Sequence, residues 1–484
     1  MLKIKNRSLI RDCSFINGQW LTSNHQFQVF NPANEKSVSS VFEVESCQLE
    51  LAITSATNAL DVWQNLTAQE RGHRLNQWQL LMRENLDDLA RLLVLEQGKP
   101  LQEAKGEIIH AANYVKIYAE ISSKLSPDNA IDAEAEQRAK VIRRPIGLVT
   151  AITPWNFPCA MVLRKAAAAI AAGCSVVLKP SELTPLTALA LAQLSADAGI
   201  PDGVFNVVTG SNAQAIGEVL TQHEKVAKFS FTGSTKIGKK LLQQCAAGVK
   251  RTAMELGGNA PFIVFKDADL ESAVDGAISN KFRNAGQTCV TANRFIIHQD
   301  IAEEFTQRVV DKIASLKLGD GLVADTSIGP LISGFAIEKI QTLIDQAVND
   351  GAKVVVGGSA CNEKGHFYQA TLIKDVEPNM TIFKREIFGP VMSIVTFESD
   401  DEAIKIANQT EFGLCAYLYS KDKDKINNLS KRLQVGMLGI NESRLSNPLA
   451  PFGGIKQSGM GREGGYYGIE EYLYYQYLCE KIEA

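Results

Sequence analysis

The chain begins with short strand patterns and continues with longer helical ones. Apolar and polar residues alternate over Phe15 to Trp20 and over Phe27 to Phe30, with Asn-Gly and Asn-Pro pairs at the turns. These segments predict short strands. Thr67 and Glu70 then match a capping box, and apolar residues at helical spacing follow them. A further helix is expected at about 102–120.

From Ile142 onward, apolar strand patterns alternate regularly with helical patterns. Strands are expected at 147–153, 175–179, 204–208, 227–233 and 251–255, and helices at about 160–172, 186–198, 213–221 and from 235. This alternation predicts a parallel, doubly wound sheet. Ligands of such sheets bind at the carboxyl ends of the strands, where the turns PWNFP, KPSELTP and FTGST lie.

The alternation restarts after Gly258 and predicts a second α/β domain. Its expected strands are FIVF, RFIIH, KVVVGG, SIVTF, AYLYS and GMLGI, with helices near 269–284, 302–316, 337–349, 401–408 and 424–433. The tail from Tyr466 is rich in aromatic residues and alternates, which is typical of a strand used in assembly.

Three units follow from these patterns. We expect a first α/β domain from 1–122 and 146–254, a second α/β domain from 255–445, and a small β arm for oligomerisation from 123–145 and 466–484. The expected fold class is therefore α/β with a doubly wound parallel sheet, a second α/β domain and a small β arm.

Composition narrows the class of protein. The 484 residues are 45% hydrophobic and 21% charged, with a formal net charge of -4, which is typical of a globular protein of several domains. No block of like charge suggests binding to nucleic acid or to an anionic membrane. The nine cysteines form no CxxC pair and the six histidines do not cluster near them, so no metal site is expected. Free thiols and the lack of an apolar signal segment favour a cytoplasmic protein.

Cys289 is the first candidate for chemistry. It lies in FRNAGQTCV, where Gly286 allows a tight turn and polar Gln287 and Thr288 precede the thiol. Core cysteines usually have apolar neighbours, so a nucleophile is one interpretation and inert packing is the other.

Three further segments have both a functional and a structural interpretation. Glu255 in MELGG ends a strand, where it could serve as a general base or as an ordinary surface acid. Asn156 in TPWNFP could donate to an oxyanion or stabilise its own turn. Gly233 and Gly238 in FTGSTKIG lie where a pyrophosphate could bind a helix N-terminus, although the GxGxxG fingerprint is absent.

The motifs together are more specific than any one of them. PWNFP, LKPSELTP, FTGST, MELGG, GQTC, EIFGP and PFGGIKQSG occur in this order along the chain. In this respect the chain resembles the NAD(P)-dependent aldehyde dehydrogenase superfamily over essentially its whole length, and its flanking segments are most similar to the succinate-semialdehyde dehydrogenase branch. A catalytically silent protein on the same fold would be expected to lack Cys289, Glu255 or Asn156, and all three are present.

The resemblance implies a covalent mechanism. Cys289 would attack the aldehyde as thiolate, and the Asn156 amide and the Cys289 backbone N–H would hold the oxyanion. Loss of hydride to the nicotinamide would leave a thioester, and Glu255 would activate the water that hydrolyses it.

The resemblance also implies a set of cofactor contacts. These would be made by Trp155 and Asn156 at the nicotinamide end, Lys179, Ser181 and Glu182 near the adenosine ribose, Gly233 and Ser234 at the pyrophosphate, Glu386 at the nicotinamide ribose, and Leu256 and Phe388 near the ring. Glu182 can accept from ribose hydroxyls and repels a 2′-phosphate, which favours NAD over NADP. Lys179 could offset that repulsion, so use of NADP stays open as the weaker alternative.

The expected substrate depends on two arginines and a serine. Arg164, Arg283 and Ser446 match the positions at which the succinate-semialdehyde branch binds the substrate carboxylate, although each arginine could instead pair with a surface acid. The expected substrate is succinate semialdehyde, with glutarate semialdehyde or a broader range of aldehydes as the alternative. Position 291 is Thr, so no second cysteine stands two residues after Cys289, and Arg444 could reach the pocket mouth or face solvent. The family usually forms homodimers or homotetramers, and the aromatic tail agrees with either.

Overall fold

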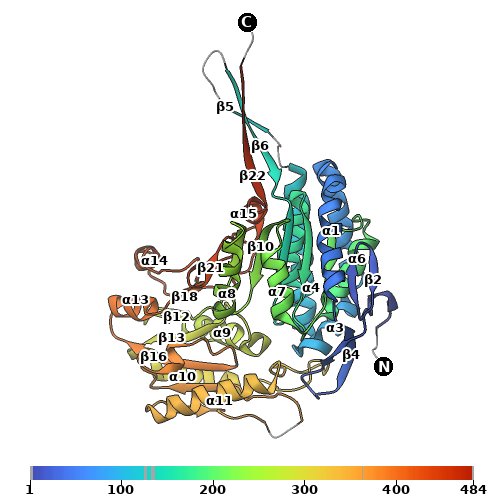
Figure 1. The fold of residues 1–484 in the computed structure, drawn as a ribbon. Coiled ribbons are helices and arrows are strands. Elements are labelled where there is room, and N and C mark those ends of the chain that lie inside the picture. The colour runs from blue at the N-terminus through green and yellow to red at the C-terminus, as the bar shows by residue number, and fades with distance from the viewer. Residues whose placement is uncertain (1–3, 125–127, 132–136, 362–363, 482–484) are drawn as a thin grey trace.

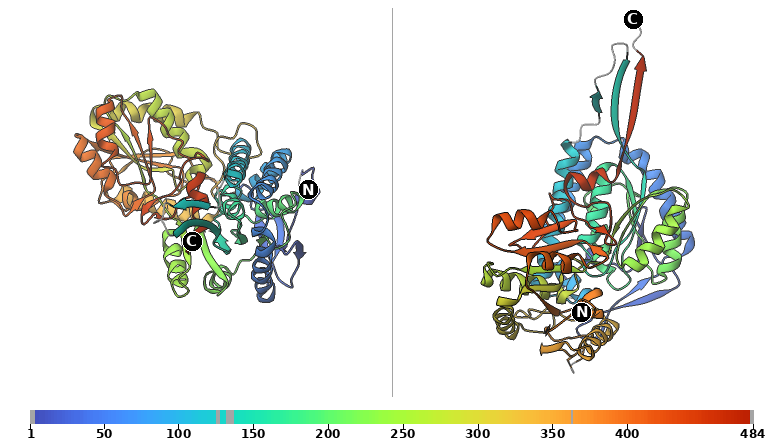
Figure 2. Two further views of the ribbon diagram at one scale, coloured as in Figure 1. Left: turned by 90° about the horizontal axis from the view of Figure 1, so that it is seen from above. Right: turned by 90° about the vertical axis from the view of Figure 1, so that its left-hand side faces the viewer.

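Two α/β bodies lie side by side, and a narrow arm projects away from both (Figure 1). The computed structural model describes residues 4–124, 128–131, 137–361 and 364–481. Figure 2 shows the arm standing clear of the two bodies in a perpendicular view. The expected fold class is confirmed.

The first body is built on an eight-stranded sheet. Its five central strands are parallel, in the order β9-β8-β7-β10-β11, and antiparallel strands flank them at both edges. In spatial order the strands are β2 (Gln19–Leu21), β1 (Ser14–Ile16), β9 (Phe205–Val207), β8 (Ser175–Lys179), β7 (Leu148–Ile152), β10 (Val226–Thr232), β11 (Arg251–Glu255) and β21 (Gly459–Met460).

Both faces of this sheet are buried. Alternate residues of β8 point to opposite faces, so Val176 and Leu178 join one hydrophobic core and Val177 joins another. The helices that contribute to the two cores are α2 (Ala68–Glu84), α3 (Leu86–Gln97), α4 (Leu101–Lys124), α5 (Ala160–Ala172) and α6 (Leu186–Asp197) on one side, and α1 (Ser46–Gln64), α7 (Ala213–Gln222) and α8 (Thr235–Ala246) on the other. Because strands covered on both faces are mostly apolar, the apolar runs of the sequence predicted this sheet correctly.

The capping box at the start of α2 is confirmed. The Glu70 N–H donates to the Thr67 hydroxyl, and a Glu70 carboxylate oxygen accepts from the Thr67 N–H at 2.7 Å. The helical run divides at Asn85 into α2 and α3, and Gly98 caps α3 in the left-handed conformation. The next helix, α4, reaches the site described below.

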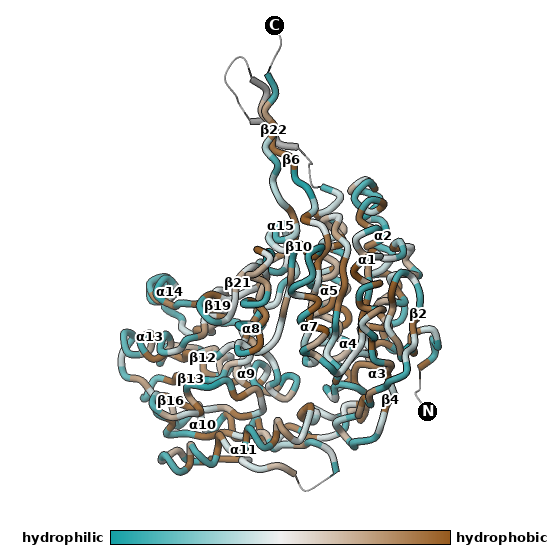
Figure 3. Tube along the Cα trace, viewed as in Figure 1, coloured by the Kyte–Doolittle hydropathy of each residue, from teal (hydrophilic) through white to brown (hydrophobic). Residues whose placement is uncertain are grey.

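The second body contains a seven-stranded sheet that is parallel except at one edge. In spatial order its strands are β14 (Lys353–Val356), β15 (Thr371–Lys374), β16 (Val391–Phe397), β13 (Ala292–His298), β12 (Ala260–Val264), β18 (Cys415–Tyr419) and β19 (Met437–Ile440). Its helices are α9 (Leu270–Phe282), α10 (Gln299–Ala314), α11 (Gly334–Asn349), α12 (Thr381–Lys384), α13 (Asp400–Asn408) and α14 (Lys423–Ser430). In Figure 3 the outer helix α14 is largely hydrophilic, whereas α5 inside the first body is hydrophobic.

The arm is a three-stranded antiparallel sheet that joins distant parts of the chain. Its order is β22 (Leu473–Lys481), β6 (Gln137–Pro145) and β5 (Asp128–Ile131), and β22 and β6 pair from Leu473 with Pro145 to Lys481 with Gln137. Residues 125–127, 132–136 and 482–484 of the expected arm lie outside the described residues. The alternation from Tyr466 was wrong for its first residues, which belong to a helix, α15 (Gly465–Glu470), packed against α4 and α5.

The remaining elements are short. They are the 3-10 helices η1 (Arg7–Leu9) and η2 (Arg283–Gly286), the hairpin β3 (Gln26–Phe30) and β4 (Ser37–Phe42), and the pair β17 (Phe412–Gly413) and β20 (Ile455–Lys456). Within the described ranges, no helix combines the length and apolar character that crossing a membrane requires. The same residues contain no group of three or more His, Cys, Asp or Glu side chains that could hold a metal ion.

Candidate active site

The loop before Cys289 has an unusual backbone. After α9 ends at Phe282, η2 places Asn284 and Ala285 in the left-handed region with φ of 51° and 54°. Gly286 follows with φ of 73°, and a Cβ there would collide with the Gly389 carbonyl. Non-glycine residues in this conformation are strained, and such strain is found where the surrounding structure fixes a loop for function.

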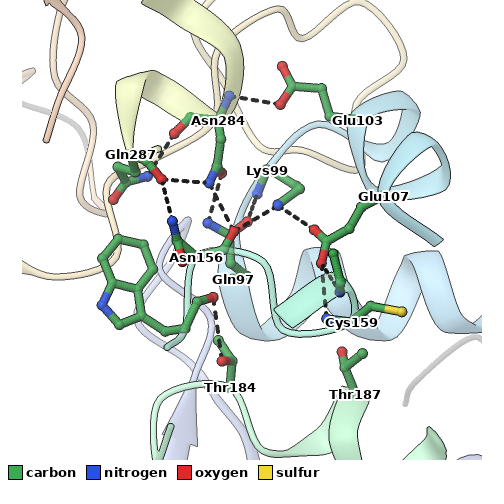
Figure 4. Close-up of polar contacts among 12 residues, drawn as sticks. Gln97, Lys99, Glu103, Glu107, Asn156, Cys159, Thr184, Thr187, Asn284 and Gln287 are labelled. Carbon is green, nitrogen blue, oxygen red and sulfur yellow. Dashed lines mark hydrogen bonds and ion pairs between the residues drawn. The ribbon is translucent and has the colours of Figure 1, made fainter. Parts of the chain in front are cut away.

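Asn156 is bonded directly to this loop. Its side-chain Nδ2 donates to the Gln287 carbonyl at 3.0 Å, two residues before Cys289 (Figure 4). Its backbone carbonyl accepts from Asn284 Nδ2 at 3.0 Å and from Lys99 Nζ at 2.9 Å. The turn that contains Asn156 is therefore fixed to the segment that carries the thiol, and the second N–H of the amide is left to donate elsewhere.

A buried ion pair supports this turn from behind. Lys99 Nζ lies 2.5 Å from Glu107 Oε2, and both side chains are almost fully buried. Glu107 Oε1 accepts from the N–H groups of Cys159 and Ala160, at the first turn of α5 (Figure 4). The pair thus joins α4 to the N-terminus of α5, where a carboxylate is electrostatically favourable.

Glu255 ends β11 and is buried. Its Oε2 has no hydrogen-bond partner among the described residues. Burial raises the pKa of this carboxyl well above its usual value, and the nearby Glu463 raises it further, whereas Lys165 and Arg164 oppose the rise. A carboxylate with a raised pKa is a stronger base, so Glu255 is suited to take a proton from water.

Cys289 differs from the structural cysteines of the chain. It is partly exposed, whereas Cys13, Cys159, Cys174, Cys245 and Cys415 are buried. Its pKa is raised to about 12, first by desolvation and then by the charges of Glu386 and Glu255, while Arg164 and Arg283 lower it. Because these four charged groups act on the sulfur, the fold brings the predicted thiol, base and arginines to one place.

Arg164 is buried beside Ser446. Its Nη2 donates to the Ser446 hydroxyl at 2.6 Å, and its guanidinium stacks over the rings of Phe452 and Tyr114. Only 4% of Arg164 is exposed, yet Nε and Nη1 have no hydrogen-bond partner in the described part of the chain, although Nη1 lies 3.8 Å from the Glu463 carboxylate. These donors are available to an anion.

Arg283 occupies a different environment. It is exposed, and its guanidinium lies 5.6 Å from the centre of the Phe157 ring. Arg444 is also exposed, and its backbone N–H donates to Glu442.

His110 was not singled out by the sequence, because one histidine in a helical pattern carries no signal. Its Nε2 lies 2.8 Å from the Ser446 hydroxyl oxygen. Desolvation and the positive charges of Arg164 and Arg283 lower the pKa of this imidazole to about 4, so it is neutral at pH 7. Lys99 and Glu107 were also missed from the sequence, because no local sequence pattern indicates an ion pair that supports a distant turn.

Predicted cofactor residues lie along the carboxyl edge of the first sheet. Lys179 ends β8, and its Nζ lies 3.3 Å from a Glu182 carboxylate oxygen, while the Ser181 hydroxyl accepts from the Leu183 N–H. Ser234 caps α8, and the Gly233 N–H donates to the Glu255 carbonyl at 3.0 Å. The N-terminus of α8 therefore faces this edge with backbone donors that suit a phosphate.

This edge also has polar atoms left to satisfy. The hydroxyls of Thr153, just after β7, and Thr232, at the end of β10, are buried without a hydrogen-bond partner among the described residues. Buried polar groups are normally paired, so both hydroxyls favour a polar ligand at this edge. The residues present therefore fit a dinucleotide.

The remaining predicted cofactor contacts are Trp155, Leu256, Glu386 and Phe388. The rings of Trp155 and Phe388 meet edge to face at 5.6 Å, and Phe388 has a φ of 57°. Glu386 accepts from the Gly258 N–H at 3.0 Å, and burial raises its pKa. The Leu256 N–H donates to the Ser458 carbonyl at 2.9 Å.

Comparisons with known proteins give matches over nearly the whole chain. The model of the Aldehyde dehydrogenase family matches residues 20–478. The chain is 48% identical to the succinate-semialdehyde dehydrogenase [NADP(+)] GabD of Escherichia coli, over 99% of each chain. It is 47% identical to a glutarate-semialdehyde dehydrogenase of Pseudomonas putida, covering 99% of this chain and 100% of that one. The crystal structure of an NADP-dependent enzyme from E. coli matches with a TM-score of 0.98 at 48% identity, over 99% of this chain and 100% of the other.

Proposed function

Since the chain belongs to the aldehyde dehydrogenase family, we propose that it oxidises succinate semialdehyde to succinate with NAD. The observation that best supports this substrate is the buried guanidinium of Arg164. Its unsatisfied donors lie beside the Ser446 hydroxyl and near enough to Cys289 to affect the thiol pKa. A short aldehyde with a carboxylate at its far end matches this arrangement, because its carboxylate can bind the Arg164 donors while its carbonyl carbon lies at Cys289.

Cys289 and Asn156 carry the first half of the reaction. The Cys289 thiolate adds to the aldehyde carbon, and the thiol proton passes to a base. The free N–H of the Asn156 amide and the Cys289 backbone N–H stabilise the oxyanion of the thiohemiacetal. When bound, the nicotinamide supplies the acceptor for the hydride that leaves this carbon.

Glu255 carries the second half. Its carboxylate takes a proton from the water that attacks the thioester, and the Cys289 thiol is released with the carboxylic acid product. The raised pKa of Glu255 supports this role, because a carboxylate with a higher pKa takes a proton more readily.

Replacing Arg164 or Arg283 by alanine tests the substrate. For R164A we expect kcat/KM for succinate semialdehyde to fall by about 10²–10³, because a buried carboxylate would lose its charged partner. The exposed Arg283 should contribute less, about tenfold. The measurement is NADH formation with succinate semialdehyde and with butanal, which has the same length and no carboxylate.

The rates with butanal distinguish a loss of carboxylate binding from a general loss of activity. Arg432→Ala, at a surface ion pair with Asp401, is the matched control and should leave both rates unchanged. Equal losses with both aldehydes in R164A and R283A would contradict the carboxylate role. Glutarate semialdehyde is the second candidate, supported by the P. putida relative, and kcat/KM for the four- and five-carbon acids separates the two.

Glu182 is proposed to select NAD. Its side chain is 39% exposed beside Lys179, where a carboxylate can accept from ribose hydroxyls and repel a 2′-phosphate. Glu182→Gln should therefore lower kcat/KM with NAD by about tenfold and raise it with NADP. Steady-state rates with both cofactors test this, with Glu218→Gln on α7 as the control. A wild-type enzyme that prefers NADP would contradict the proposal.

The division of labour among the units is also proposed. The segments 1–122 and 146–254 would bind the cofactor, and 255–445 would supply Cys289. The arm of 123–145 and 466–484 would join copies of the chain into a dimer or tetramer, which its exposed Tyr474, Tyr475 and Tyr477 support.

A further inference from the structure

The Ser446 hydroxyl has two neighbours that come from different helices. Arg164 of α5 approaches it at 2.6 Å, and His110 Nε2 of α4 approaches it at 2.8 Å. The His110 ring meets the Tyr114 ring edge to face at 5.1 Å, and the Arg164 guanidinium lies over the Tyr114 ring, 4.9 Å from its centre. Tyr114 therefore packs against both partners of the hydroxyl.

The protons at Ser446 can be assigned from chemistry. Arginine can only donate, so Arg164 Nη2 occupies one lone pair of the Ser446 oxygen. If His110 carries its proton on Nε2, it donates to the second lone pair, and the Ser446 proton is free to point at a ligand. If Nε2 is unprotonated, Ser446 donates to His110 instead and has no proton left for an anionic ligand.

The first arrangement is favoured when an anion is present. The Ser446 proton then points at the anion beside the unsatisfied donors of Arg164. Neutral imidazole can exchange its two tautomers without a change of net charge. A side chain at position 110 without an N–H near the position of Nε2 could not hold the Ser446 hydroxyl in this orientation.

We propose that His110 is a specificity-determining residue, which holds the Ser446 hydroxyl so that its proton, together with Arg164, binds the carboxylate of the substrate. This inference rests on the proposed function and adds a residue on α4 to the site. His110 touches Ser446 and acts through it, so its effect should appear in substrate binding and not in the chemical step.

Three variants of His110 test the proposal. In H110L, KM for succinate semialdehyde should rise about tenfold and kcat should change less than twofold. H110Q places an amide N–H near the position of Nε2 and should restore KM to within about threefold. H110N has the same amide on a side chain too short to reach Ser446, so it should behave like H110L. The Gln and Asn pair keeps the test valid if H110L is unstable.

A double variant and an uncharged aldehyde complete the test. If His110 acts through Ser446, S446A should raise KM about as much as H110L, and the H110L/S446A enzyme no further. KM for butanal should change much less in every variant. Additive losses, failure of H110Q to differ from H110N, or equal losses with butanal would overturn the proposal.

The wild-type enzyme separates this proposal from the proposed function. If it shows no preference for succinate semialdehyde over butanal, the proposed function fails. If it shows the preference and H110L keeps it, only the role of His110 is wrong.

Discussion

Replacing Cys289 by alanine is expected to lower kcat for aldehyde oxidation by about five orders of magnitude, to the background rate. The aldehyde has no carbon that can release hydride until a nucleophile adds to it, and Cys289 is the thiol that lies near Glu255, Glu386 and Arg164. NADH absorbance measures the loss. Cofactor binding, followed by quenching of protein fluorescence, should persist because the first sheet is unchanged.

Cys47→Ser is the matched control, because this exposed thiol lies on α1. It should leave the rate unchanged. The wild-type enzyme offers a second measurement. With a pKa of about 12 for Cys289 in the free enzyme, the rate of its alkylation by iodoacetamide should rise about tenfold per pH unit near neutrality. A wild-type Cys289 that iodoacetamide does not alkylate, or substantial activity in C289A, would contradict the assignment.

Glu255→Gln is expected to lower steady-state kcat by about 10²–10⁴, because glutamine cannot take a proton from the attacking water. The buried Oε2 of Glu255 has no partner among the described residues, so the amide fits without displacing a protein hydrogen bond. Formation of the thioester does not require that water. Rapid mixing should therefore show a burst of about one NADH per site, followed by a slow steady state.

The burst separates two roles of Glu255. If the burst is also lost, Glu255 deprotonates Cys289 before the first chemical step. If kcat stays near the wild-type value, another group activates the water. Recovery of the acylated Cys289 peptide from E255Q by mass spectrometry would locate the block at hydrolysis.

The sequence predicted the parts of the fold that depend on neighbouring residues. The capping box at Thr67 satisfies N–H groups within one turn, and the runs SVVLK and RFIIH have consecutive apolar residues at their centres because both faces of their strands are covered. Local chemistry also marked Cys289, Glu255 and Asn156, which interrupt apolar segments at strand or helix ends. Their family resemblance added the proposed roles.

Sequence patterns within a segment were less informative where packing against distant residues decides the secondary structure. Asn85 divides one predicted helix into α2 and α3. The aromatic tail was predicted as a strand from Tyr466, but its first residues form α15 because they pack against α4 and α5. Alternation alone cannot distinguish these outcomes, since the partner surface lies elsewhere in the chain.

The sequence by itself therefore predicted the class of fold, the order of its elements and candidates for the reacting thiol, acid and amide. Only the tertiary structure decided that His110 meets Ser446, 336 residues away, that Lys99 supports the Asn156 turn, and that β6 pairs with β22. The physical reason is that hydrogen bonds, ion pairs and pKa shifts act over a few ångströms in space, whereas periodicity and capping report only on residues that are close along the chain.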